Sequence, residues 1–509
     1  FFRKNSVLIV VNLPCTEISR ARMSEKRIDT VPGKWRQFLA ALVANISLLS
    51  YGTMIGWQSP MTPQLQSPDT PVGEPMTDEE ASWISGVMCL SGCFMTLVIG
   101  PITDRYGRKI VCCMAAVPFL ICWLLTIFAT EHLHIYIARF FAGIGGAVVL
   151  FVIPLYVSDI SCDEIRGMLG SLLVFLLNMG ILLAYILGAV LSFRVFAISA
   201  LILPLLYLGL FVFMPESPVY LIRSNRVHQA ARSLAWLRAG NTSAVEQEML
   251  RLRAEREASL SEKSVGLSQL FRDKATIKGL IISVGLFCGQ QMCGIFAMIS
   301  YTQSIFELAG SSLSPDVAAM TVGAIQVFGS YLSTALMDRM GRKPLLLISN
   351  LGMCVCHLSL GTFCYLQILG YDVTSFAWIP IVSLSVFVIT YAFGMGPGPY
   401  VVTAEIFSRD VASLGTTIGL FFVWLTAFVV VKFYSNLLAL LGMAGCFFLF
   451  GIFCAGNAIF TVVLIPETKG RPRQLILDEL NGIASVFDEK WHVVEKFASG
   501  KSAASAEHV

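Results

Sequence analysis

Two long blocks of the chain carry almost no charge, and this feature constrains the fold most. Blocks 37–214 and 276–465 hold only 28 of the 36 basic and 33 acidic residues in a chain of 509. Soluble domains usually carry about 25 % charged residues, whereas this chain carries 14 %. The blocks are therefore expected to lie in lipid, which excludes an ordinary soluble enzyme and a disordered chain. A net charge of +3 is too small to indicate nucleic-acid binding.

Each block divides into six apolar windows of the ~20 residues that a helix needs to cross a bilayer. The predicted spans are 37–57, 81–103, 110–130, 133–157, 167–192, 194–214, 276–306, 315–337, 344–369, 375–404, 412–436 and 441–465. We therefore expect two six-helix bundles, 37–214 and 276–465. The polar segment 215–275 between them is expected to form amphipathic helices that brace the bundle, or a simple linker.

Basic residues alternate between the two sides of the predicted spans and set their orientation. The loop 58–80 has five acidic residues and no Lys or Arg, whereas segment 215–275 has ten basic residues. The tails, 1–36 and 466–509, and segment 215–275 are therefore predicted to be cytoplasmic. The plasma membrane is the default location, because neither tail carries an acidic dileucine signal. A start at the first methionine would make residues 1–22 an artefact of translation.

The two blocks repeat one another. A charged turn occurs twice, as Asp104-Arg105-Tyr106-Gly107-Arg108-Lys109 and as Asp338-Arg339-Met340-Gly341-Arg342-Lys343, 234 residues apart. The sixth and twelfth spans are followed by Pro215-Glu216-Ser217 and Pro466-Glu467-Thr468, and the fourth and tenth by Asp159 and Glu405. Parallel six-helix halves around a midplane cavity are the architecture of major facilitator transporters.

The repeated turns have a mechanical interpretation. Gly107 and Gly341 can adopt positive φ in a tight turn, and the neighbouring arginines can pair with carboxylates at nearby helix ends. The predicted charge latch consists of Asp104, Arg105, Gly107, Arg108, Asp159, Glu164, Arg166, Glu216, Asp338, Arg339, Gly341, Arg342, Glu405 and Glu467. These groups are expected to hold the cytoplasmic side shut during part of a cycle. The alternative is a charge cluster that only sets topology.

As a set, the motifs over roughly residues 35–480 resemble the sugar porter family of major facilitator transporters. They are the two turns, Arg139-Phe140, Pro215-Glu216-Ser217-Pro218, Gln290-Gln291-Met292-Cys293-Gly294-Ile295, Gly396-Pro397-Gly398-Pro399-Tyr400, Ala404-Glu405-Ile406-Phe407 and Pro466-Glu467-Thr468-Lys469-Gly470. Within that family, the chain resembles most the branch of insect facilitated trehalose transporters and facilitative glucose transporters. This resemblance rests on Ala81-Ser82-Trp83, Arg166-Gly167 and Asn178-Met179-Gly180. The resemblance implies an all-α membrane protein with twelve spans in two pseudo-symmetric bundles.

A sugar has hydroxyl groups that donate and accept hydrogen bonds, so neutral amides suit it. Amides in lipid-embedded helices are costly and are expected to face a wet cavity. The candidate ligands are Gln290, Gln291, Gln326 and Asn178 with Phe296, Tyr400 and Trp424. The resemblance to the sugar porters supports a role in sugar binding for the two adjacent glutamines, Gln290 and Gln291. The alternative for a single amide such as Asn178 is a contact between helices, and for Trp424 it is packing.

The tenth span contains residues that cannot sustain a regular helix: Gly394, Gly396, Pro397, Gly398 and Pro399. The span is therefore expected to break there and to act as the hinge of a gate. Tyr301 ends the extracellular part of the seventh span, where the resembled family has a gating aromatic residue.

Four positions lose a polar group of the family pattern: Phe296 and Val423 replace Asn, Val174 replaces a polar sugar ligand, and Ala412 replaces Arg. A fifth departure, Tyr400 in place of Trp, keeps a stacking face and adds a hydroxyl. Each lost hydrogen bond would cost ~1 kcal/mol net, or about fivefold in affinity. Because of these departures, the sequence does not identify the sugar. They also motivate one alternative function, a non-transporting sugar sensor on the same fold.

Acidic residues occur only near the ends of the spans, as with Glu307 and Glu405, so a proton acceptor is missing at mid-membrane. The predicted function is passive transport of a hexose or trehalose by alternating access, with a proton-coupled symporter as a further alternative. No enzyme activity, cofactor or metal site is predicted, because Cys354, Cys356 and His357 have no further ligands nearby. The expected partners are the sugar and the lipid bilayer, with no nucleic acid and no obligate protein partner.

Overall fold

The computed structural model describes residues 32–261, 273–308, 310, 313–408 and 411–482, and every regular element in these ranges is a helix. The first half consists of α2 (Lys34–Gly56), α3 (Gln58–Gln66), α4 (Asp78–Tyr106), α5 (Arg108–Ile127), α6 (His132–Ile160), α7 (Arg166–Val190) and α8 (Phe193–Phe211). The connecting segment holds α9 (Pro218–Arg223), α10 (Val227–Leu237) and α11 (Thr242–Ser261).

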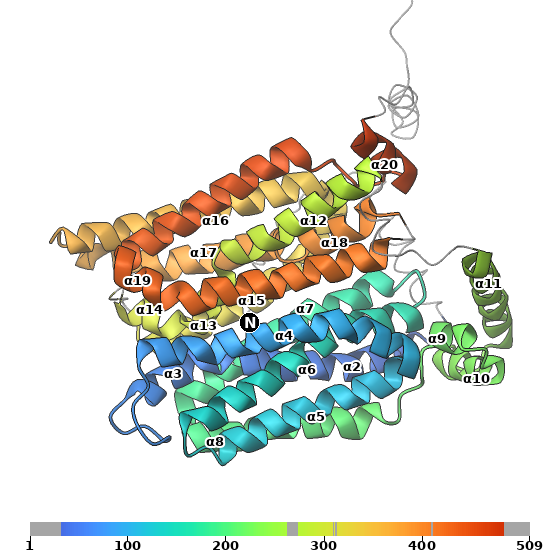
Figure 1. Ribbon diagram of the computed structural model, residues 1–509, viewed down its shortest axis with the longest axis horizontal. Coiled ribbons are helices and arrows are strands. Elements are labelled where there is room, and N and C mark those ends of the chain that lie inside the picture. The colour runs from blue at the N-terminus through green and yellow to red at the C-terminus, as the bar shows by residue number, and fades with distance from the viewer. Residues whose placement is uncertain (1–31, 262–272, 309, 311–312, 409–410, 483–509) are drawn as a thin grey trace, which may run out of the picture.

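The second half consists of α12 (Lys274–Met292), α13 (Ile295–Ser300), α14 (Thr302–Leu308), α15 (Pro315–Met340), α16 (Arg342–Ile368), η2 (Thr374–Phe376), α17 (Ile379–Phe393), α18 (Gly398–Ile406) and α19 (Ala412–Leu464), followed by α20 (Arg473–Asn481). Figure 1 shows the two halves as two layers of helices that run in similar directions. The main contacts between the halves are those of α4 with α19 and of α7 with α15. These four helices form the boundary along which the halves meet.

Ten segments are long and apolar enough to cross a membrane. One of them, Leu414–Leu464, lies within α19, which is two helices joined at Gly442, where the backbone angles are not helical (φ 67°, ψ 175°). Counting α19 as two spans and adding α15, which packs against α7 and α17, gives the twelve spans expected from the sequence.

Two spans differ from the prediction in detail. The expected loop 58–80 begins as helix α3, because Trp57 keeps helical backbone angles (φ −55°, ψ −34°) and the chain continues almost unbroken from α2. The seventh span is divided into α12, α13 and α14, with Gly294 in the left-handed region at the first break (φ 83°). The predicted terminal tails lie mostly outside the described residues.

The two ends of the molecule differ, as Figure 1 shows. We call the end that carries α9, α10, α11 and α20, at the right, the capped end, and the end with α3 and α14 the opposite end. The cap has a small apolar core of its own, which includes Tyr220, Leu234, Met249 and Leu252. The side chains of this core come from α9, α10 and α11, which pack against one another.

Candidate functional site

Two of the candidate amides meet across the boundary between the halves. Gln326 Nε2 in α15 donates a hydrogen bond of 3.1 Å to Asn178 Oδ1 in α7, and both side chains are buried. Each residue lies near the middle of its helix. The halves are therefore joined at mid-depth by two neutral groups, each able to donate and accept. In this conformation Asn178 is also a helix–helix contact, which is the alternative considered for it.

Gln290 and Gln291 lie near the end of α12, and the amide nitrogen of Gln290 is already bound. Gln290 Nε2 donates to the backbone carbonyls of Met395 (2.7 Å) and Gly396 (2.8 Å). The side-chain oxygens of Gln290 and Gln291 are buried and have no partner among the described residues. A buried acceptor without a donor is costly, so these two oxygens are the groups best placed to accept a bond from a hydroxyl of a ligand.

The tenth span is broken where the sequence concentrates glycine and proline. Helix α17 ends at Phe393 and α18 begins at Gly398, and the residues between them are Gly394, Met395, Gly396 and Pro397. Pro399 lies in the first turn of α18. A Cβ atom on Gly394 would lie 2.3 Å from the carbonyl oxygen of Leu345 in α16, so the break fits only a residue without a side chain. The carbonyl groups that the break frees include the two that bind Gln290.

The three aromatic candidates have different environments. Tyr400 in α18 is 42 % exposed and lies edge-on to Phe287 of α12, with ring centroids 5.0 Å apart. Trp424 in α19 is buried against α4, where a Cβ atom on Gly92 would lie 2.8 Å from the indole ring. Phe296 in α13 is half-buried and packs against the core. Tyr400 is thus the candidate ring with the most surface open to a ligand, whereas Trp424 packs between the halves.

The opposite end is closed by hydrogen bonds between the halves. Tyr185 of α7 donates to the carbonyl oxygen of Ile299 (3.0 Å), and the backbone N–H of Gln303 donates to Ser59 Oγ (3.1 Å). Ser85 and Ser300 approach to 3.4 Å. Tyr301, the candidate gating residue, is buried within the second half, where it stacks on Tyr434 at 5.0 Å between ring centroids.

Lys432 is a functional candidate to which the sequence patterns assigned no role. It lies in an apolar stretch of α19, yet its side chain is buried and crosses to α4. Its ammonium group donates to Ser82 Oγ (2.8 Å), lies 4.6 Å from the centroid of the Trp83 ring and is 3.9 Å from Glu79. A buried cation needs such partners, so its presence in an apolar run was the available signal. Lys432 joins the two halves at the opposite end.

The charged turn of the first half forms a buried cluster at the capped end. Gly107 has a φ of 93°. Next to it, Arg108 Nε lies 3.3 Å from Asp159, and its Nη1 lies 3.4 Å from Asp104. Glu216 accepts a hydrogen bond of 2.9 Å from the backbone N–H of Lys109. Burial raises the pKa of Glu216, although the backbone donors act in the opposite direction.

The turn of the second half repeats this geometry. Gly341 has a φ of 96°. Arg342 Nη2 lies 2.9 Å from Glu405, which also accepts a hydrogen bond of 2.5 Å from Thr468. Glu467 accepts a hydrogen bond of 3.1 Å from the backbone N–H of Arg342. The two turns therefore use equivalent residues for equivalent contacts.

The remaining members of the predicted charge latch have smaller roles in this conformation. The carbonyl oxygen of Arg105 accepts a bond from the hydroxyl of Tyr220, and Glu164 is exposed. The side chains of Asp338 and Arg339 lie outside the described part of the chain. None of the ion pairs described at the capped end joins the first half to the second: each lies within one half, within the cap, or between the cap and the first half. In this conformation they do not hold the two halves together.

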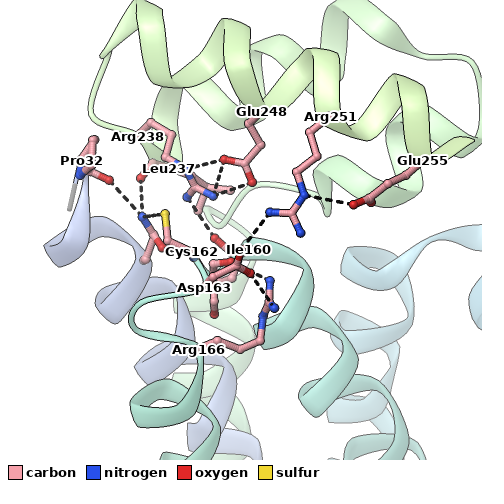
Figure 2. Close-up of polar contacts among 12 residues, drawn as sticks. Pro32, Ile160, Cys162, Asp163, Arg166, Leu237, Arg238, Glu248, Arg251 and Glu255 are labelled. Carbon is pink, nitrogen blue, oxygen red and sulfur yellow. Dashed lines mark hydrogen bonds and ion pairs between the residues drawn. The ribbon is translucent and has the colours of Figure 1, made fainter. Parts of the chain in front are cut away.

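Figure 2 shows further polar contacts that tie the cap to the first half. Arg238 binds both oxygens of Glu248 (2.8 and 2.9 Å) and donates to the carbonyl oxygen of Ile160 at the end of α6 (3.1 Å). Gln37 of α2 accepts a bond from the backbone N–H of Cys162 (2.9 Å). Sequence reasoning missed Arg238, because nothing in its spacing distinguishes it from the other basic residues of the cap.

Asp163, in the turn between α6 and α7, binds two arginines from different elements. It lies 2.7 Å from Arg166 and 3.0 Å from Arg251 of α11. Partial burial acts to raise the pKa of Asp163, but the two arginines outweigh it and hold that pKa below its ordinary value. Arg166, assigned to the latch from the sequence, thus contacts the cap through a shared carboxylate.

A small cavity opens between α2, α6 and α7, and its lining includes Asn45, Ser158 and Arg166. Within the described residues, no group of three His, Cys, Asp or Glu side chains is placed to hold a metal ion. The site is therefore built from amides, aromatic rings and backbone carbonyls, with charged clusters at the ends of the helices.

Comparisons with known proteins agree with this arrangement. The family model described as "Sugar (and other) transporter" matches residues 40–479. The chain is 32 % identical to the facilitated trehalose transporter Tret1 of Bombyx mori over 437 residues, which cover 86 % of this chain and 85 % of that protein. It is 34 % identical to the facilitated trehalose transporter Tret1 of Apis mellifera ligustica over 438 residues, 86 % of each chain.

Among solved structures, the inward-open conformation of the xylose transporter XylE from E. coli superposes with a TM-score of 0.72. The two chains are 23 % identical, and the match covers 87 % of this chain and 99 % of that one. At this level of identity the likeness shows a shared fold.

Proposed function

Because the chain belongs to the sugar transporter family of the major facilitator superfamily, whose members are multi-pass membrane proteins, we propose that it carries an uncharged sugar by passive alternating access. A hexose or trehalose is the proposed substrate class. The observation that carries the proposal is the meeting of neutral amides from both halves: the Gln326–Asn178 bond, with the unpartnered oxygens of Gln290 and Gln291. Such groups suit sugar hydroxyls, because amides and hydroxyls both donate and accept hydrogen bonds.

In the proposed orientation the capped end faces the cytoplasm and the opposite end faces the outside of the plasma membrane. The contacts of Tyr185, Gln303 and Lys432 close the outer side in this conformation. At the capped end, by contrast, none of the ion pairs described joins the first half to the second. This difference supports assigning the conformation to a state in which the site opens toward the cytoplasm.

The two charged turns are proposed to act as paired latches in the cycle. In the present conformation Arg108 and Arg342 hold the helix ends of their own halves. When the halves rock to open the outer side, these helix ends approach one another, and the exposed carboxylates Asp104 and Glu164 become available to the turn of the other half.

The positions of the acidic groups support the proposed passive mechanism. Asp159, Glu405 and Asp316 lie within the first or last turn of their helices or next to a break, and none is near the Gln326–Asn178 pair along the chain. Proton-coupled carriers need a group that gains and loses a proton on the transport path. A symporter is thus the weaker proposal, and it predicts that adding sugar makes the outside medium alkaline.

Counterflow in liposomes tests the proposal directly. Purified protein is reconstituted with unlabelled sugar inside, and uptake of labelled trehalose, glucose, fructose or inositol is measured without a proton gradient. We expect uptake of at least one sugar, and imposing a proton gradient across the liposome membrane should leave its rate unchanged. Absence of exchange for the whole panel by folded protein would overturn the proposal.

The second candidate function, a sugar sensor without transport, is favoured by the four departures from the family pattern at Phe296, Val174, Val423 and Ala412. It predicts sugar binding by calorimetry with no counterflow. The variant Phe296→Asn restores the amide of the family pattern, and its effect on the range of sugars accepted would show whether this departure narrows specificity.

A further inference from the structure

A buried histidine lies directly behind the candidate site, and the proposed transport mechanism makes no use of it. His357 in α16 is fully buried. Its Nε2 atom lies 2.9 Å from the backbone carbonyl oxygen of Cys293, the residue that follows the last turn of α12. Because a carbonyl oxygen can only accept, Nε2 must carry a hydrogen and donate it. The imidazole is thus a fixed donor to the end of a helix.

The environment of the ring favours the neutral form with one hydrogen. Three phenylalanine rings surround it, Phe387 of α17 at 4.8 Å and Phe447 and Phe450 of α19 at 6.0 and 5.6 Å between centroids. Its Nδ1 atom is buried and has no partner in the described part of the chain. A protonated imidazole would place a second donor there with nothing to accept it.

The bound carbonyl belongs to the joint at which the seventh span changes direction. Gly294 follows it in the left-handed region, and its Cα lies so close to Phe450 that a Cβ atom would be 3.0 Å from that ring. The Cys293 thiol donates to the carbonyl oxygen of Gln290 (2.9 Å). The break removes the Cys293 carbonyl from a continuous helical ladder, and at membrane depth such a group needs another donor.

The joint connects the two functional parts of the seventh span. Gln290 and Gln291 precede it at the end of α12, and Tyr301 follows it at the end of α13. We propose that His357 is a positioning residue for transport: its neutral imidazole anchors the Cys293 carbonyl and so fixes the geometry between the sugar-binding amides and the outer gate. The proposal rests on the proposed function, and it assigns a role to a side chain that does not itself touch the substrate.

Two substitutions separate the donor from the volume of the ring. His357→Phe keeps an aromatic ring but removes the donor, and His357→Gln carries an amide N–H that can reach the position of Nε2. In counterflow we expect His357→Phe to raise the half-saturating sugar concentration by about tenfold, because a buried carbonyl loses its only side-chain donor. His357→Gln is expected to restore most of the affinity.

A matched control removes a buried donor far from the joint. In Tyr207→Phe, the hydroxyl that donates to the carbonyl oxygen of Cys112 (2.9 Å) in the first half is lost. We expect this variant to lower the unfolding temperature without changing the half-saturating concentration. If His357→Phe behaves in the same way, the histidine is merely structural and the proposal is overturned.

Hydrogen exchange tests the joint independently of transport. The backbone N–H groups of residues 294–301 are expected to exchange about tenfold faster in His357→Phe than in the wild type or in His357→Gln. Unchanged exchange in His357→Phe would overturn the proposal even if the protein transports sugar. If His357→Phe exchanges faster than the wild type but the wild type shows no counterflow, anchoring of the joint is supported and the transport function is contradicted.

Discussion

The two charged turns at the capped end share their geometry but differ in burial. Gly107 and Gly341 have nearly the same backbone angles (φ 93°, ψ 165° and φ 96°, ψ 163°). The side chains of Arg108 and Asp159 are 3 % and 10 % exposed, whereas those of Arg342 and Glu405 are 16 % and 29 % exposed. A duplicated device has thus become a buried anchor in one half and a more hydrated contact in the other.

The cap accounts for much of this difference. Tyr220 of α9 lies beneath Arg108, with the guanidinium 5.4 Å from the ring centroid, and Ser217 donates to Asp159 (2.5 Å). In the second half Thr468 fills the place of Ser217, and α20 packs against α12 and α18 instead of covering the turn. Buried ion pairs are costly to break because water cannot replace the lost partner at once. We therefore expect the second turn to release first in a cycle.

The largest expected effect comes from removing the buried cation of the first turn. Arg108→Leu leaves the Asp159 carboxylate buried without its partner, which should cost about 3–5 kcal/mol of stability. Thermal unfolding of the protein in mild detergent measures this loss. Arg105→Leu is the control, since Arg105 is an exposed neighbour in the same turn, and it should unfold like the wild type. An unchanged unfolding temperature for Arg108→Leu would contradict the assignment of a buried anchor.

The next effect tests whether the cap makes the difference between the halves. Arg238→Met removes three charge-assisted hydrogen bonds, but Glu248 is 24 % exposed and can be rehydrated, so about 2–3 kcal/mol should be lost. Faster hydrogen exchange in α10 and α11 would report the loss. Arg251→Met, at a half-exposed arginine of the same cap, should cost less than about 1 kcal/mol. Equal losses in the two variants would show that burial of Arg238 is unimportant.

The corresponding change in the second turn should be milder. Arg342→Leu leaves Glu405 with a hydrogen bond from Thr468 and access to water, so the expected loss is about 1–2 kcal/mol. The unfolding temperatures of Arg342→Leu and Arg108→Leu, measured under the same conditions, give the comparison. A loss of stability as large as that of Arg108→Leu would show that the difference in burial between the turns does not affect how much each ion pair contributes to stability.

The smallest expected effect concerns acid. The pKa of Asp163 is held below its ordinary value of 3.8, so its ion pairs stabilise the folded state above that pH. This contribution is lost as the pH falls through the lowered pKa. Unfolding temperatures measured from pH 7 to pH 3 should fall more steeply for the wild type than for Asp163→Asn. The side chain is 56 % exposed, so a large difference at neutral pH would contradict this account.

The spans and the repeat were predictable because they depend on composition and local pattern. Lipid-exposed helices need long apolar runs, and two copies of one turn are visible without any structure. The equivalent roles of Asp159 and Glu405 followed from the same repeat. In each case the signal lies within one segment or in the comparison of two segments.

The partners of the site residues were not predictable, because they come from distant parts of the chain. Nothing near Gln290 indicates that its amide binds carbonyls 105 residues away, and nothing near Gln326 indicates Asn178. The partners of Lys432 were not predictable either, since they lie on α4. One sequence must also be compatible with every conformation of the transport cycle, whereas these contacts belong to one conformation.

The hydrogen bond between Gln326 and Asn178 has a kinetic consequence. The two amides bind each other across the halves at mid-depth, and a carrier without sugar needs to break this bond if the halves separate there as it turns over. A bound sugar removes the need, since its hydroxyls can accept and donate in place of the partner amide. Loaded carriers should therefore reorient faster than empty ones, by up to about fivefold for a bond worth ~1 kcal/mol. Such trans-acceleration would make exchange of sugar across the membrane faster than net transport in one direction.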